Sequence, residues 1–112
     1  KKNLILYKRN NMFEVNSENF EKEVLGYKGK LMVKFGADWC APCKMMDKTI
    51  ANLNSDIQIR IVKVDIENSP ELAQKYNVSS IPYTLFLNNG EIKEKMVGII
   101  KDKDLINIIN RI

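Results

Sequence analysis

Residues 31–36 are the segment that most limits the folds open to this chain. They read Leu-Met-Val-Lys-Phe-Gly, so Lys34 is the one polar side chain in the segment. A strand with apolar residues on both faces belongs most often to a parallel sheet that helices cover on both sides. The segment therefore predicts an α/β fold with a central sheet, and it places Lys34 at least partly inside that sheet.

Helix and strand signals alternate along the rest of the chain. Helices are expected at residues 17–27 with Ser17 as the cap, at residues 41–53, from Ser69-Pro70 to about Tyr76, and at the C-terminus with Asp102 as the cap. Further strands are expected at residues 58–66, 83–87 and 91–97, the last two joined by a tight turn at Asn89-Gly90. This order predicts a mixed sheet with helices on both faces.

Composition and charge fit one globular domain. The chain has 112 residues, 45% of them hydrophobic, and no apolar run approaches the ~20 residues of a membrane span. After residue 11 the chain has 14 basic and 14 acidic residues, so its net charge of +4 comes from Lys1, Lys2, Lys8 and Arg9. Residues 12–112 contain no cluster of basic residues of the kind that is typical of a nucleic-acid-binding surface. We interpret residues 1–11 as an N-terminal extension or an extra strand, and residues 12–112 as the folded domain.

The two cysteines, Cys40 and Cys43, lie three residues apart at the expected start of a helix. A bridge over this separation closes almost no loop and adds little stability, so the pair is better suited to chemistry. Unpaired N–H groups and the partial positive charge of a helix N-terminus favour a thiolate. Cys40, expected to be the more exposed, is predicted to attack a disulfide, and Cys43 to resolve the mixed disulfide. Pro42 suits the first helical turn, and Trp39 offers a flat apolar surface to a partner.

Two other uses of the cysteine pair are alternatives. A zinc site needs about four ligands, and the chain has no histidine and no second cysteine pair. A complete metal site within one chain is therefore not expected, although a metal shared between two chains stays an alternative. The chain could also be a docking module whose cysteines are dispensable or only sense redox state.

Several segments of the sequence resemble the thioredoxin family. The similarity runs from about Met12 to Ile112 in order and spacing, and four segments carry it: Lys-Phe-Gly-Ala-Asp-Trp-Cys-Ala-Pro-Cys-Lys at 34–44, Val-Lys-Val-Asp at 62–65, Val-Ser-Ser-Ile-Pro at 78–82, and Asn-Asn-Gly-Glu at 88–91 with Val-Gly at 97–98. The resemblance implies a thioredoxin-like three-layer α/β/α sandwich with a mixed central sheet, and it makes residues 12–112 a thioredoxin-like domain.

The resemblance also implies roles for single residues. Cys40 would be the nucleophile and Cys43 the resolving residue. Pro82 would follow a cis peptide bond and face the cysteines, and Ile81 would offer backbone hydrogen bonds to a substrate strand. Gly98 would line the substrate groove, where a side chain would block the approach of the backbone.

Two lysines depart from the family pattern. Lys34 stands where the family usually has a buried acid that helps to deprotonate the resolving cysteine. A charged Lys34 would favour thiolates, a neutral one would act as a base, and one that reaches solvent would do neither. Lys63 matches a lysine that often pairs with that acid, so here two lysines would repel unless one turns away. Asp65 and Glu67 are alternative partners.

Three further departures affect the surroundings of the motif. Gly36 stands where an aromatic residue is common, which is expected to loosen the packing behind the motif. Lys48 falls about where the family has a proline within the helix, so a straighter helix is expected. Tyr83 follows Pro82 where a small hydroxyl residue is usual, and it is expected to narrow or reshape the substrate groove.

These patterns together predict a protein dithiol–disulfide oxidoreductase that reduces target proteins through Cys40 and Cys43. The cysteine pair would be the redox group, with no metal or other cofactor. An upstream reductase such as a thioredoxin reductase would supply electrons to a monomer in the cytoplasm, and neither nucleic acid nor a membrane span would be involved. The alternative is a subunit of an exported or membrane-linked thiol pathway, placed in the periplasm if an N-terminal signal has been removed.

Overall fold

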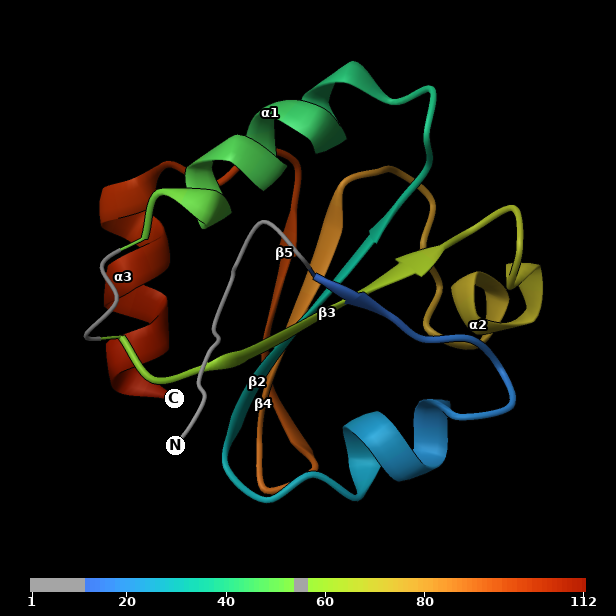
Figure 1. Cartoon of the computed structure of the whole chain (residues 1–112), viewed down its shortest axis with the longest axis horizontal. Helices are drawn as coiled ribbons and strands as arrows, with labels where there is room; N and C mark the ends of the chain where they lie inside the picture. The colour runs from blue at the N-terminus through green and yellow to red at the C-terminus, as the bar shows by residue number, and fades with distance from the viewer. Residues whose placement is uncertain (1–11, 54–56) are drawn as a thin grey trace.

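The computed structural model describes residues 12–53 and 57–112, which form a five-stranded sheet with the strand order β1-β3-β2-β4-β5 (Figure 1). β2 and β3 are parallel, β1 is parallel to β3, and β4 is antiparallel to both β2 and β5. The strands are Phe13–Glu14 (β1), Lys30–Gly36 (β2), Arg60–Asp65 (β3), Tyr83–Asn88 (β4) and Glu91–Val97 (β5). The extension predicted at residues 1–11 lies outside the described residues.

Helices cover both faces of this sheet. Figure 1 shows α1 and α3 on one face, and α2 with the π-helix η1 on the other. These helices are Glu21–Leu25 (η1), Ala41–Ala51 (α1), Pro70–Lys75 (α2) and Asp102–Arg111 (α3). The predicted α/β sandwich with a mixed sheet is confirmed. None of the helices in the described chain has the length and apolar character needed to cross a membrane.

Strand β2 is buried on both faces because it lies at the centre of the sheet. Successive side chains of a strand point to opposite faces. Val33 and Phe35 pack in the core layer that includes Phe20 and Leu72 from the η1 and α2 side. Met32 packs in the second layer, which Met46, Ile50, Leu105 and Ile109 complete from α1 and α3. The apolar run of this strand therefore serves two core layers at once.

The first helix differs from the expected one. It is a five-residue π-helix, Glu21–Leu25, and the side chain of Ser17 does not cap it. The preceding turn is held by Asn16, whose Oδ1 accepts the N–H groups of Glu18 and Asn19. Ser17 instead hydrogen-bonds Glu71, which lowers the pKa of that carboxyl. Asn16 thus takes the local role that was assigned to Ser17.

The last helix begins one residue away from the expected cap. Lys101 is the N-cap of α3, and Asp102 is its first residue. The Asp102 carboxylate accepts the N–H of Lys103 at 2.7 Å, and its charge suits the positive end of the helix. The expected apolar stripe is present, with Leu105, Ile108 and Ile109 buried and Ile112 partly buried.

Strand β1 is an element that the sequence did not reveal. It has two residues, Phe13 and Glu14, which pair in parallel with Val62 and Lys63 of β3. The amide of Val15 also donates to the carbonyl of Lys63 at 2.9 Å. A strand this short shows no measurable alternation, so its partner in the sheet alone defines it.

Candidate active site

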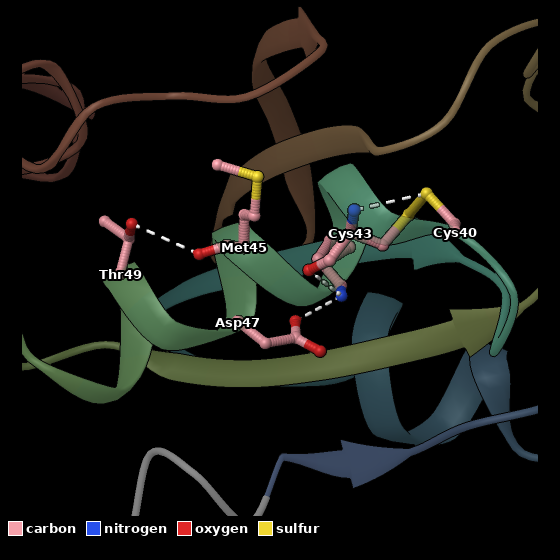
Figure 2. Close-up of polar contacts among 6 residues, drawn as sticks. Cys40, Cys43, Met45, Asp47 and Thr49 are labelled. Carbon is pink, nitrogen blue, oxygen red and sulfur yellow. Dashed lines mark hydrogen bonds and ion pairs between the residues drawn. A yellow bond between two sulfur atoms is a disulfide. The ribbon is translucent and has the colours of Figure 1, made fainter.

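Cys40 and Cys43 lie where the carboxyl end of β2 leads into α1. Cys40 is the N-cap of α1 with an extended backbone, and Pro42 and Cys43 lie in the first turn. The two cysteines form a disulfide, with Cα atoms 5.3 Å apart. Figure 2 shows the Cys43 amide pointing at the Cys40 sulfur, to which it donates at 3.2 Å. An N–H group at the positive end of a helix stabilises a Cys40 thiolate once the disulfide is reduced.

The disulfide is shielded, whereas the residue before it is exposed. Cys40 is 4% exposed and Cys43 2%. Cys40 is thus the more exposed of the two, as expected, although both cysteines are buried in this oxidised form. Trp39 is 65% exposed. Its Nε1 donates to Glu67 at 2.9 Å, which holds the indole over the surface next to the pair. The position of the ring suits the docking role predicted for Trp39.

The loop before β4 is joined to the end of β5. The Ile81–Pro82 peptide bond is cis, as the resemblance implied. The Pro82 carbonyl accepts the N–H of Gly98 at 2.8 Å. Gly98 has a φ of 89°, and no heavy atom lies within 4 Å of the position that its Cβ would take. The space beside Gly98 is therefore open, as the predicted groove requires; substrate binding by Ile81, Pro82 and Gly98 stays a prediction.

The side chain of Tyr83 does not shape an exposed groove, contrary to expectation. It is buried in the core layer beneath η1 and α2. Tyr83 is opposite Phe35 in the register of β4 and β2, and the two rings meet edge to face with centroids 5.9 Å apart. An aromatic pair of this geometry stabilises the sheet. The residue after Pro82 therefore contributes its side chain to packing.

Comparison with known proteins assigns the family. A family model described as Thioredoxin matches residues 11–111. The chain belongs to the thioredoxin family. The thioredoxin of Chlamydia trachomatis is 39% identical over 99 residues, which span 87% of this chain and 94% of that protein. The thioredoxin of Rickettsia bellii is 36% identical over 98 residues, 86% of this chain and 93% of the relative.

A solved structure supports the same assignment. A chain from a study of the thiol-resolving mechanism of yeast mitochondrial 1-Cys peroxiredoxin superposes with a TM-score of 0.83 and is 25% identical. The match covers 95% of this chain and 100% of the other. With the Cys40–Cys43 disulfide at the start of α1, family membership makes the chain a dithiol–disulfide oxidoreductase.

Lys34, which replaces the family's usual buried acid, pairs with an acidic residue of α1. Lys34 is 3% exposed, and its ammonium forms an ion pair with Asp47. Figure 2 shows Asp47 on α1, one turn beyond Cys43. Its carboxylate accepts a hydrogen bond from the Lys34 ammonium. The Lys34 Nζ also lies 3.4 Å from the Cys43 carbonyl oxygen. The alternative in which Lys34 extends freely into solvent is therefore wrong.

Sequence reasoning missed Asp47. It is the acidic residue of α1 and follows Cys43 by four positions, which places both on one face of the helix. That spacing was the available signal. Asp65 and Glu67, the alternative partners expected for the two lysines, form other hydrogen bonds. Glu67 accepts the indole N–H of Trp39, and Asp65 accepts the backbone N–H of Glu67.

Lys63 does not form the pair that it often makes in the family. It is opposite Lys34 in the register of β3 and β2. Both lysines line a cavity of about 240 Å³ behind Cys43. Within residues 12–53 and 57–112, no carboxylate lies within ion-pair distance of Lys63. Lys63 therefore adds a positive charge to the cavity, and this charge has no ion-pair partner among the described residues.

Gly36 lies beside the Cys43 sulfur and also lines the cavity behind Cys43, so the looser packing expected at this position stays a prediction. A Cβ placed on Gly36 would be 3.0 Å from the Cys43 sulfur and 3.7 Å from the Lys34 Nζ. The absence of a side chain at this position makes room for both atoms. α1 runs from Ala41 to Ala51. The straighter helix expected from Lys48 in place of a proline stays a prediction. In the described part of the chain, no group of three or more Cys, Asp or Glu side chains gathers as a metal site requires.

Proposed function

We propose that the chain reduces disulfides in target proteins, with Cys40 as the nucleophile and Cys43 as the resolving residue. The observation that carries this proposal is the Cys43 amide directed at the Cys40 sulfur at the N-terminus of α1. That arrangement stabilises negative charge on Cys40, and a thiolate is the attacking form of cysteine. The thioredoxin relatives support the same direction of electron flow.

The reaction proceeds by two exchanges. The Cys40 thiolate attacks one sulfur of the target disulfide, and the other target sulfur leaves as a thiolate that takes a proton from water. Cys43, after losing its proton, attacks the Cys40 sulfur. The Cys40–Cys43 bond forms, the bond to the target breaks, and the second target thiol is released. The target gains two electrons and two protons, and the chain is oxidised by the same amount.

Apolar side chains near the site offer a surface for the target. Val97 is 64% exposed and Ile99 47%, and they flank Gly98 at the end of β5. Trp39 is exposed beside the cysteine pair. An extended target segment would dock against this surface, with the backbone of Ile81 as its hydrogen-bonding partner. Exposed aromatic and aliphatic side chains of this kind commonly mark a site for binding other proteins.

The oxidised chain must be returned to its dithiol form. An upstream reductase such as a thioredoxin reductase would supply two electrons and open the Cys40–Cys43 bond by the reverse exchange. The reaction uses no group other than the cysteine pair. A reducing compartment such as the cytoplasm keeps a dithiol of this type reduced, and it is the location that we propose for the chain.

Turnover of a model protein disulfide tests the proposed function. Insulin is incubated with dithiothreitol and with the intact chain, Cys40→Ser or Cys43→Ser. The intact chain should accelerate reduction, and Cys40→Ser should abolish that acceleration because no attacking thiolate remains. Cys43→Ser should accumulate a mixed disulfide that intact-mass measurement detects. Replacing dithiothreitol with a thioredoxin reductase and its reductant tests the electron supply.

The matched control is Lys48→Ala, an exposed position of α1 beyond the cysteine pair. It should retain the turnover of the intact chain. Absence of turnover in the intact chain, with the control equally inactive, would contradict the proposal that the chain is a general reductase. Full turnover by Cys40→Ser would remove Cys40 from the role of nucleophile.

A further inference from the structure

A buried ion pair lies directly behind the resolving cysteine. Lys34 comes from the centre of the sheet and Asp47 from the second turn of α1, so the pair joins β2 to α1. The Lys34 side chain is 4% exposed and that of Asp47 33%. The ammonium is therefore held inside the protein, while the carboxylate is in contact with solvent. A buried ammonium of this kind needs its partner, because an unpaired buried charge is strongly destabilising.

The Lys34 ammonium and the Cys43 sulfur border the same small space. That space lies over Gly36, whose missing Cβ would be 3.0 Å from the sulfur and 3.7 Å from the Nζ. The Nζ is also 3.4 Å from the carbonyl oxygen of Cys43. No side chain stands between the two groups at Gly36. An ammonium that borders the same space as a sulfur, in a site of low exposure, favours the charged thiolate over the thiol.

We propose that Lys34 and Asp47 together control the ionisation of Cys43. The Lys34 ammonium stabilises the Cys43 thiolate that must form before the mixed disulfide is resolved. Asp47 is a positioning residue: it keeps the ammonium beneath the sulfur, and its own negative charge limits how far the thiolate is favoured. The proposal rests on the resolving role that we propose for Cys43.

The proton balance of this step involves solvent. The Cys43 thiol releases its proton to water in the cavity that Lys34 and Asp47 line. The thiolate then attacks the Cys40 sulfur of the mixed disulfide, and the target sulfur leaves and takes a proton from water. The Asp47 carboxylate contacts the buried ammonium and is also exposed to solvent, which gives the cavity a polar route outward.

Other charges face the same cavity and set the background against which the pair acts. They come from β1, the turn before α1, α1 itself and β3, and they are Glu14, Asp38, Lys44, Lys63 and Asp65. Their signs are mixed. The Lys34 ammonium is distinguished from them by its burial and by its contact with Cys43.

Titration of a single thiol tests the proposal. In a Cys40→Ser background Cys43 is the one remaining cysteine, so the ultraviolet absorbance of the thiolate reports its ionisation alone. Lys34→Met should move the ionisation midpoint up by about one pH unit, because the stabilising charge is removed. Asp47→Asn should move it down, because the opposing charge is removed while the Asn amide oxygen and the Cys43 carbonyl can still accept from the ammonium and hold it in place. Lys34→Arg should keep the midpoint near that of the parent.

Lys30→Met is the matched control. Lys30 is on the same strand, and its Nζ also donates to a backbone carbonyl, that of Ile109 at 2.7 Å. Its removal takes away a comparable bond at the other end of β2 and should leave the midpoint of Cys43 unchanged. An equal shift in Lys30→Met and Lys34→Met would overturn the proposal, as would shifts of the same sign in Lys34→Met and Asp47→Asn.

A kinetic measurement completes the test. The rate at which Cys43 releases a preformed Cys40–target disulfide should fall about tenfold at neutral pH in Lys34→Met, and recover as the pH rises, because the thiolate fraction sets the rate. If Lys34→Met does not fold, the downward shift expected of Asp47→Asn and the unchanged midpoint expected of Lys34→Arg still decide the matter. The thiol titration needs no target protein, so its result stands apart from the fate of the proposed reductase activity.

Discussion

At the scale of single residues, a missing side chain shapes the site as much as the cysteines do. Gly36 leaves the space in which the Cys43 sulfur and the Lys34 ammonium come together. Lys34 is tolerated in a buried strand because Asp47 meets its charge from α1. The ammonium is therefore paired with the carboxylate and borders the same space as the sulfur, so a change in one of the three groups is expected to act on the others.

Gly36→Ala should destabilise the oxidised protein by about 1–3 kcal/mol, because the new methyl group crowds the Cys43 sulfur. The added Cβ would be 3.0 Å from the Cys43 sulfur, closer than ordinary contact. Urea unfolding of the oxidised protein measures the loss. The loss should be smaller in the reduced protein, where the sulfur is free to rotate. Equal losses in both forms would show that the contact with the disulfide sulfur is not the cause.

At the scale of elements, an ion pair connects the outer strand to the last helix. Arg111, at the end of α3, donates to Glu94 of β5 with an Nη2–Oε1 distance of 2.8 Å. The hydrogen bonds from Arg111 hold the pKa of Glu94 below its ordinary value of 4.5. A carboxyl whose pKa is lowered on folding stabilises the fold above that ordinary value, and the contribution disappears as the pH falls through the lowered pKa.

Glu94→Gln should therefore lower the free energy of unfolding slightly at neutral pH and leave it unchanged at a pH below the lowered pKa. The effect is small because the pair is largely exposed, and added salt should reduce it further. Urea unfolding across this pH range makes the measurement. Glu91→Gln is the control, since Glu91 pairs with Lys93 on the same strand. A loss at neutral pH that persists in strong acid would assign the effect to packing.

At the scale of the whole molecule, one sheet supports two core layers, and the site lies at one end of both. β2 contributes side chains to each layer and then turns at Gly36 into the cysteine motif. β3, which is parallel to β2, ends at Asp65 beside the same cavity. In sheets of this kind, functional residues gather beyond the carboxyl ends of parallel strands.

Because both layers share β2, the oxidised protein should unfold in one cooperative transition. Trp39 is the single tryptophan and lies beside the disulfide, so its fluorescence reports the site, whereas far-ultraviolet circular dichroism reports the sheet and helices. The urea midpoints from the two signals should coincide. An earlier midpoint for Trp39 would mean that the site opens before the two core layers do.

The sequence by itself determined strands β2 to β5, helices α1 to α3 and the cysteine pair. The reason is that these features depend on local patterns: an apolar run buried on both faces, a tight turn at Asn89-Gly90, and two cysteines at the start of a helix. Boundaries were less well determined. Ser17 and Asp102 were assigned as caps, whereas Asn16 holds the first turn and Lys101 precedes α3, because several neighbouring residues can serve the same end of a helix.

Only the tertiary structure decided what lies behind the cysteines. Asp47 reaches Lys34 because α1 packs across β2, and no spacing within the sequence states which face of the sheet a helix covers. Tyr83 is in the core because its register with Phe35 places their rings together. A side chain at Gly36 would crowd the Cys43 sulfur because α1 places that sulfur over the end of β2. Each of these outcomes depends on which elements meet, and contacts between distant segments exist only in the folded chain.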